Sequence, residues 1–243
     1  MKHLMVFDFD HTVVDDNCDI WVIQSLPNQN LPNSVKCSYR KGHWTDYMCR
    51  VMQYIGDQGV SPDRVRAVME TIPLTAGMID LLTFISENKN TVDCIVISDA
   101  NSLFIEWVLT AAGLQSAVDQ VFSNPARFNE SGWMEVQHYH SHDCNKCPVN
   151  LCKRKVLELY LSEKMAGGTD YERIFYVGDG GNDFCPTSCL RENDVVMPRL
   201  GFTLEKLLAR ATTQEGSPSV RANVVVWSSG SKILQELKAS MKS

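Results

Sequence analysis

A short apolar run that ends in two acids is the feature that most constrains this chain. Residues 4–7, Leu-Met-Val-Phe, are typical of a short buried strand. Asp8 and Asp10 follow one residue apart, and Thr12 comes next. Because strand side chains alternate with period two, the two carboxylates begin on the same side of the chain. Their mutual repulsion is tolerable where a divalent cation lies between them. The alternative is a strand that runs into a solvated, acidic turn.

Two later apolar runs also end in polar groups. The run at 93–97 ends at Ser98, and a helical pattern follows over 102–112. The hydroxyl of Ser98 either caps that helix or holds a phosphate oxygen. The run at 174–177 ends in the sequence Gly-Asp-Gly-Gly-Asn-Asp at 178–183, whose glycines permit positive φ or a close backbone approach. Since ligands of open α/β sheets bind at the carboxyl ends of strands, these ends are candidate site positions.

The segment between the first two strands is long enough to be a separate unit. It holds roughly 75–80 residues, far more than a simple crossover needs. Apolar residues at helical spacing predict helices at 47–55, at 62–72 after Ser61, and at 76–87. We therefore predict a helical cap at 15–91 inserted into a core made of 1–14 and 92–243. The core is also predicted to hold strands at 118–122, 195–197 and 224–227, a small hairpin at 133–138, a mobile loop at 214–219 and a helix at 233–241.

Bulk properties exclude several classes of protein. The chain has 243 residues, a formal net charge of -6 and a pI near 5.5, which argues against general nucleic-acid binding. It has no apolar run long enough to span a membrane and no secretory signal pattern at the start. Its nine cysteines are then expected to be free thiols in a reducing, cytoplasmic location. No feature of the sequence bears on the oligomeric state.

The ordered set of motifs resembles the haloacid-dehalogenase (HAD) superfamily of phosphohydrolases over nearly the whole chain. The set consists of DxDxT at 8–12, the apolar strand that ends at Ser98, Lys153, and GDGxND at 178–183. The stretches DFDHTVVDDNCD, YRKGHWTDYM, ISDANS, CNKCPVNLCK and YVGDGGNDFCP are similar to the branch that includes phosphoethanolamine/phosphocholine phosphatase and pyridoxal-phosphate phosphatase. The late VVVWSSG segment is most similar to the latter. The resemblance implies an α/β fold, with a Rossmann-like parallel-sheet core and a C1-type helical cap.

The resemblance also implies a magnesium-dependent phosphomonoesterase. Asp8 is then the nucleophile that forms an aspartyl-phosphate, and Asp10 is the general acid and base. The metal ligands are the carboxylates of Asp8 and Asp179 and the backbone carbonyl of Asp10, an all-oxygen set that suits Mg²⁺. Asp183 orients metal-bound water, and Asn182 assists it.

Further residues are implied to hold the substrate. Ser98 and Lys153 hold the phosphoryl oxygens. Lys155 is the alternative to Lys153, because the two lie about 200° apart on a helix and only one can face the site. Asp19 and Asp99 match positions that contact the remainder of the substrate, although an acid near a helix start is an equally ordinary reading of each.

The substrate is expected to be a small phosphorylated metabolite. Pyridoxal 5′-phosphate is the leading candidate, and Trp44 and Tyr47 are aromatic cap residues that can stack on its ring. Phosphoethanolamine and phosphocholine are the alternatives, since Asp19 and Asp99 can pair with a cationic amine. A phosphomutase, a third possibility, needs a second phosphate site, for which the cap offers no obvious basic cluster. Arg50 is either a cap residue that reaches the phosphate or a surface arginine.

One cluster of potential metal ligands lies outside these motifs. Its spacing is compatible with zinc, but all its members fall within 15 residues, whereas a structural zinc site usually brings a second, well-separated pair of ligands. The alternative is a loop of reduced cysteines. The cluster consists of His138, His140, His142, Cys144, Cys147 and Cys152.

Overall fold

The computed structural model describes residues 2–213 and 220–242, so the loop predicted at 214–219 lies outside the described residues. Its centre is a six-stranded sheet in the order β3-β2-β1-β6-β7-β8 in which each neighbouring pair is parallel. The predicted α/β class is confirmed. The last strand is shorter than the predicted 224–227, and Trp227 instead meets Arg199 in an isolated bridge. The strands are β1 (Lys2–Phe7), β2 (Val92–Asn101), β3 (Gln120–Asn124), β6 (Tyr171–Gly178), β7 (Val195–Pro198) and β8 (Asn223–Val224).

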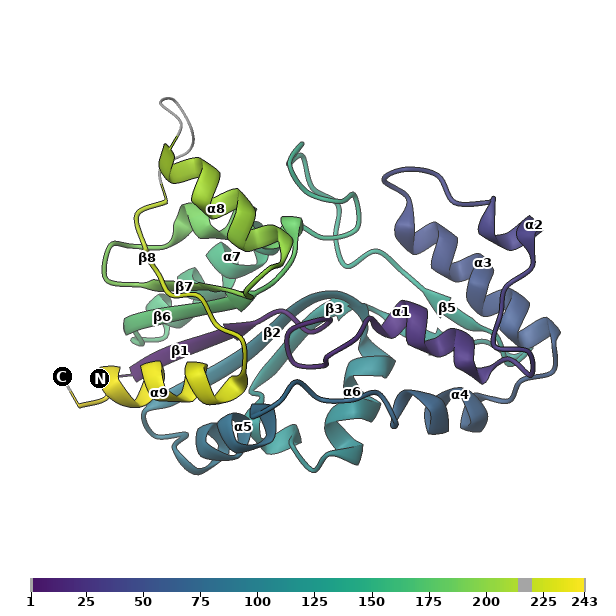
Figure 1. Ribbon diagram of the computed structural model, residues 1–243, viewed down its shortest axis with the longest axis horizontal. Coiled ribbons are helices and arrows are strands. Elements are labelled where there is room, and N and C mark those ends of the chain that lie inside the picture. The colour runs from purple at the N-terminus through teal and green to yellow at the C-terminus, as the bar shows by residue number, and fades with distance from the viewer. Residues whose placement is uncertain (1, 214–219, 243) are drawn as a thin grey trace.

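Helices cover both faces of this sheet (Figure 1). Met5 and Phe7 of β1 belong to one apolar core, and Leu4 and Val6 belong to the other. A strand that is covered on both sides must be apolar throughout, which is why the run at 4–7 has no polar alternation. One face carries α5 (Met78–Glu87), α6 (Ser102–Ala111) and α9 (Gly230–Ser240); the other carries α7 (Lys153–Ala166) and α8 (Thr203–Thr213).

The insert between β1 and β2 is helical. Ser61 caps one of its helices with its side chain, and Pro62 is the first helical residue, as predicted. The 15–91 boundaries of the cap stay a prediction; α5, near the end of that range, packs against α9 and β2. The elements of the insert before α5 are α1 (Cys18–Trp21), η1 (Val22–Ser25), α2 (Asn33–Lys36), α3 (Trp44–Asp57) and α4 (Pro62–Met69).

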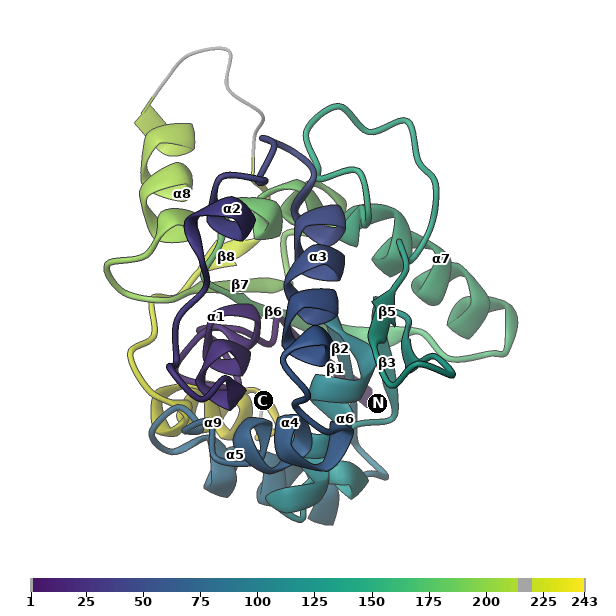
Figure 2. The same cartoon turned by 90° about the vertical axis from the view of Figure 1, so that its right-hand side faces the viewer.

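Helix α3 leans on a small hairpin of the core (Figure 2). The hairpin pairs β4 (Ala126–Phe128) with β5 (Met134–Val136) in antiparallel fashion, so only its second strand lies within the predicted 133–138 and its first strand comes earlier in the chain. Gly56 of α3 faces the Trp133 indole so closely that an added Cβ would lie 2.1 Å from its Cδ1 atom. The insert is therefore braced by the core at a point away from the sheet.

Within the described residues, no helix combines the length and the apolar character that a membrane span requires. All nine cysteines are described, and each is a free thiol.

The contact between α5 and α9 depends on two glycines. An added Cβ at Gly230 would lie 2.5 Å from the backbone carbonyl of Gly77. Gly230→Ala should therefore lower the free energy of unfolding, measured by urea denaturation, by about 1–3 kcal/mol through overpacking. Gly167→Ala is the control, because its Cβ would meet the nearest atom at 3.4 Å. Equal stability of the two variants would contradict this view of the contact.

Candidate active site

Three neighbouring strands deliver polar residues to one cavity. Strand β1 lies between β2 and β6, at the point where the strand order reverses direction, and this is where open α/β sheets bind ligands. The cavity has a volume of about 230 Å³. Its lining comes from the ends of these strands and from the insert: Asp8, Asp10, His11, Asn17, Asp19, Trp44, Ser98, Asp99, Ala100, Asp179, Gly180 and Asn182.

A buried lysine at the start of α7 joins two of the acids. The Lys153 Nζ atom lies 2.7 Å from Oδ1 of Asp8 and 2.8 Å from Oδ1 of Asp183. Burial disfavours the charge, but Asp183 and then Asp8 outweigh burial and raise the pKa of Lys153. Lys155 points elsewhere and forms an exposed ion pair with Asp143. Lys153 is therefore the lysine that contacts the cluster of acids.

Asp183 is a buried hub for four donors. Its Oδ1 also accepts from the Tyr176 hydroxyl at 2.8 Å, and its Oδ2 accepts from the backbone N–H groups of Asp179 and Gly180 at 3.1 and 2.9 Å. An added Cβ at Gly178 would lie 2.5 Å from Cγ of Asp183, so this glycine is required for close approach. Of the two possibilities raised by the glycines of this motif, close approach applies here, and Gly178 does not have positive φ.

Asp99 is held by two amides. Asn182 donates to its Oδ2 at 2.6 Å, and Asn150 donates to its Oδ1 at 3.3 Å. Asn150 also donates to Oδ1 of Asn124 at 3.2 Å, at the end of β3. Burial raises the pKa of Asp99, and Lys153 opposes that rise. The amide of Asn182 thus orients an acid of the cavity wall.

The insert supplies the opposite wall. The Trp44 indole N–H donates to Oδ2 of Asp19 at 2.6 Å, and the backbone N–H of Cys18 donates to Oδ1 of Asp10 at 3.0 Å. Burial, and then the charge of Asp10, raise the pKa of Asp19 to about 7. Burial likewise raises the pKa of Asp10. A short helix, α1, therefore contacts the acid after β1 and also carries an acid of its own.

The acids of the cavity form an oxygen-rich site that fits a divalent cation. Carboxylate oxygens of Asp8, Asp179 and Asp183 lie within 4.8 Å of one another, and all three residues are buried. Burial, and then repulsion by Asp183, raise the pKa of Asp8 and bring that of Asp179 to about 6. Since four donors already occupy Asp183, Asp8 and Asp179 are the better-placed ligands. Oxygen-only ligands suit Mg²⁺, so the residues fit the predicted ion.

The lining of the cavity differs from the sequence prediction at several residues. His11 and Asn17 line the cavity without having been predicted. Asn17 caps α1, a signal that the sequence does carry, whereas His11 adopts φ 54° in a variable position of the motif. Arg50 bonds to Ser38, through its Nη2 at 2.8 Å to the carbonyl and its Nε at 3.0 Å to the hydroxyl, and is not among the residues that line this cavity.

Tyr47 is not part of the described lining either. Its ring packs against that of Trp44 with centroids 5.3 Å apart, so it supports the aromatic residue that is in the cavity.

The fold is that of HAD-type hydrolases, and comparisons with known proteins show that the chain is a phosphatase. Residues 3–241 match the model of the family described as "Putative Phosphatase", and the chain belongs to this family. The chain is 48% identical over 242 residues to human pyridoxal phosphate phosphatase PHOSPHO2, with all of both chains covered. It is 42% identical over 242 residues to human phosphoethanolamine/phosphocholine phosphatase, covering all of this chain and 90% of that one. A solved structure of phosphoserine phosphatase, described as a phospho-aspartyl intermediate analogue, has the same fold with a TM-score of 0.61 and 15% identity, covering 97% of this chain and 98% of that one.

Replacing the buried lysine should destabilise the protein. Lys153→Met leaves Asp8 and Asp183 buried beside each other without a cation. In metal-free buffer at neutral pH, we expect the free energy of unfolding to fall by about 3–5 kcal/mol. Lys155→Met is the matched control and should leave the urea midpoint unchanged, because its ion pair is exposed. Equal midpoints for the two variants would show that the buried pairs do not stabilise the core.

Proposed function

We propose that this protein hydrolyses phosphate monoesters of small metabolites through an aspartyl-phosphate on Asp8. The observation that carries the proposal is the position of Asp8, which shares a cavity with Asp10 while Lys153 lies 2.7 Å from one of its oxygens. A phosphate ester repels nucleophiles by its charge, so attack requires positive groups around an oriented nucleophile. A carboxylate nucleophile divides the reaction into two easier steps.

In the first step, a carboxylate oxygen of Asp8 bonds to phosphorus, and the bond from phosphorus to the ester oxygen breaks. Asp10 gives its proton to the departing oxygen. Burial raises the pKa of Asp10, which favours the protonated form that this step needs, and the Cys18 N–H fixes the position of the carboxyl group.

In the second step, Asp10 takes a proton from water. The water oxygen bonds to phosphorus, the bond between phosphorus and Asp8 breaks, and phosphate leaves. Ser98 and Lys153 hold the phosphoryl oxygens in both steps. The Ser98 hydroxyl oxygen accepts from the Ala100 N–H at 3.1 Å, which leaves its hydrogen for donation to a phosphoryl oxygen.

Asp8, Asp179 and the Asp10 backbone carbonyl would hold Mg²⁺, with Asp183 fixing the loop that carries Asp179. The ion supplies positive charge that shields the phosphoryl group and stabilises charge developing in the transition state. Two or more of the cavity acids can then stay ionised side by side, because the cation reverses the repulsion between them.

The leading substrate is pyridoxal 5′-phosphate. Relatives with that name are 46–48% identical to this chain, and Trp44 offers an aromatic surface at the cavity wall. Phosphoethanolamine or phosphocholine is the second candidate, favoured by the carboxyl groups of Asp19 and Asp99, which line the same cavity. The described residues that line the cavity include neither lysine nor arginine, and Lys153 contacts Asp8 at the first phosphate position, so the described lining offers no second phosphate site of the kind that a phosphomutase needs.

Asp10→Asn tests the two-step mechanism. The variant keeps the nucleophile but cannot transfer protons, so steady-state turnover should fall by about 10²–10⁴-fold or more. With p-nitrophenyl phosphate, whose leaving group needs no acid, the first step should suffer less and phosphoenzyme should accumulate. Rapid quench followed by intact-protein mass spectrometry measures it. A variant that is slow on this substrate yet never carries phosphate would contradict the role of Asp10.

Asp8→Asn is the control for this experiment, since its amide is a poor nucleophile and no phosphoenzyme should form. Wild-type protein treated with EDTA should also lose activity and regain it with Mg²⁺. Full activity in metal-free buffer would refute the metal requirement. The role of Asp8 as the nucleophile would still be tested separately, by the absence of phosphoenzyme in Asp8→Asn.

Asp19→Asn tests which end of the substrate the insert contacts. Losing a charged hydrogen bond to an ammonium costs about 1.5–3 kcal/mol, so kcat/KM for phosphoethanolamine should fall roughly 10–150-fold relative to pyridoxal 5′-phosphate. The pKa of Asp19 is about 7, so its charge is lost as pH falls through neutrality. The preference of the wild type for phosphoethanolamine should therefore rise from about pH 6 to about pH 8, and that of the variant should not. Equal losses for both substrates would assign Asp19 to the support of Trp44.

A further inference from the structure

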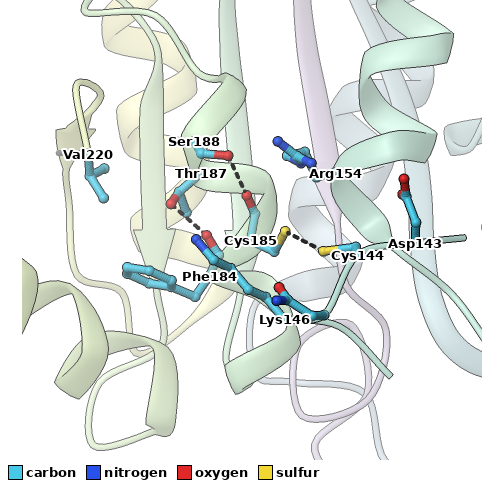
Figure 3. Close-up of a pocket in the computed structure, with 10 residues that line it drawn as sticks. Asp143, Cys144, Lys146, Arg154, Phe184, Cys185, Thr187, Ser188 and Val220 are labelled. Atoms are coloured by element: carbon cyan, nitrogen blue, oxygen red, sulfur yellow. Dashed lines mark hydrogen bonds between the residues drawn. The ribbon is translucent and has the colours of Figure 1, made fainter. Parts of the chain in front are cut away.

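Four cysteine sulfurs converge beside the start of α7. Cys144, Cys147 and Cys152 belong to the segment before this helix, and Cys185 begins η4 (Cys185–Cys189) after the glycine-rich motif. All four Sγ atoms lie within 4.8 Å of one another. Figure 3 shows the Cys144 and Cys185 sulfurs directed at each other. The two sulfur atoms are 3.8 Å apart. Cys185 is the distant ligand that the sequence cluster lacks.

The nearby histidines are engaged elsewhere. The Nε2 of His140 accepts from the backbone N–H of Cys152 at 3.0 Å, and the Nε2 of His142 lies 2.8 Å from the carbonyl oxygen of Pro148. His138 lies 3.7 Å from Asp46 of α3. The possible histidine ligands of the sequence cluster are therefore replaced by an all-cysteine set.

The spacing of the sulfurs is compatible with a mononuclear tetrahedral metal site. With metal–sulfur bonds of about 2.3 Å, tetrahedral geometry puts neighbouring sulfurs about 3.8 Å apart, which is the separation of Cys144 and Cys185. A disulfide would bring two sulfurs to about 2.05 Å, and all four residues are free thiols. Two short chain segments thus present four thiols in a geometry that suits a bound ion.

Positively charged side chains lie beside the four sulfurs. Four thiolates around a divalent ion carry a net charge of about −2, and Lys146 and Arg154 line the adjacent pocket of about 320 Å³ as compensating cations. That pocket, which Cys144 and Cys185 also line, gives an ion a path to the sulfurs.

We propose that Cys144, Cys147, Cys152 and Cys185 bind one structural Zn²⁺ ion. Soft thiolate ligands in a tetrahedral set select zinc or iron, and four protein ligands close the site to water, as in structural rather than catalytic zinc centres. On binding, each thiol releases its proton and forms one zinc–sulfur bond, so no oxidation is involved.

The zinc site would stabilise the positions of residues at the catalytic cavity. Cys152 immediately precedes Lys153, and Cys185 follows Asp183 by two residues. The ion therefore ties together the two segments that bring Lys153 within 2.8 Å of Asp183. This positioning role rests on the function proposed for Lys153, whereas zinc binding itself does not.

The test is the zinc content of untagged protein, expressed with zinc and purified without chelators. Inductively coupled plasma mass spectrometry should find about one zinc per chain in the wild type. The double variant Cys144→Ser, Cys147→Ser should lose the zinc and melt at a lower Tm. Cys189→Ser is the matched control: it lies on the same η4 segment, its thiol bonds to the Pro186 carbonyl at 3.0 Å, and it should keep the zinc. Asp8→Asn should also keep it, which separates this result from failure of the proposed catalysis.

Cobalt substitution keeps the proposal testable if the double variant does not fold. Wild-type protein loaded with Co²⁺ should show thiolate charge-transfer and tetrahedral d–d absorption, and a mercurial thiol reagent should release about one zinc per chain. Zinc-free protein with nine reactive thiols would overturn the proposal. So would a disulfide within the four cysteines in a non-reduced digest, iron in place of zinc, or full zinc retention by the double variant.

Discussion

The paired contact of Lys153 with Asp8 and Asp183 is the interaction on which the site depends. The lysine begins α7, Asp8 follows β1, and Asp183 closes the loop after β6, so two ion pairs fix three separate pieces of the chain. A buried charge that loses its partner destabilises the fold, so these ion pairs favour the one arrangement of the three segments that keeps all three charges paired. Asp183 in turn holds the backbone of Asp179, so the lysine indirectly sets the position of both candidate metal-binding carboxylates.

Much of the fold could be predicted because its central strands are covered on both faces. Such strands contain continuous apolar runs, and each run stops where the polar residues of the site begin, after Phe7, Ile97 and Val177, although β2 itself continues to Asn101. Helical geometry also showed that only one of Lys153 and Lys155 could face the site. Helix α8 was missed although Leu204 and Leu208 are spaced four residues apart. The last strand was overestimated: Val225 and Trp227 still donate backbone hydrogen bonds to Val196 and Pro198 of β7, but regular strand pairing ends at Val224.

The contacts that could not be predicted are those between segments far apart in the sequence. Asn150 lies 51 residues from Asp99, and Cys185 lies 41 residues from Cys144, yet each pair is in contact. The residues next to Asn150 and Cys185 in the sequence do not indicate these partners, because the contacts form only when α7 and η4 pack in the folded protein. The sequence cluster of histidines and cysteines accordingly indicates the right part of the chain. The group of sulfurs that the structure brings together leaves out the histidines and adds one distant thiol, Cys185.

Other long-range contacts place part of the insert at the candidate site, although most of the insert lies outside the sheet. Helix α3 is braced on the β4–β5 hairpin through Gly56 and Trp133, and its first residue, Trp44, reaches back to bond Asp19. Asp19 is therefore held in two ways. Trp44 binds its carboxylate, and its backbone belongs to α1, the short helix that contacts Asp10. Its burial beside Asp10 keeps its charge dependent on pH near neutrality. Under the proposed function, a shift of the hairpin would move Trp44, release Asp19 and change the charge that faces the substrate, so selectivity would be coupled to a contact remote from the phosphate.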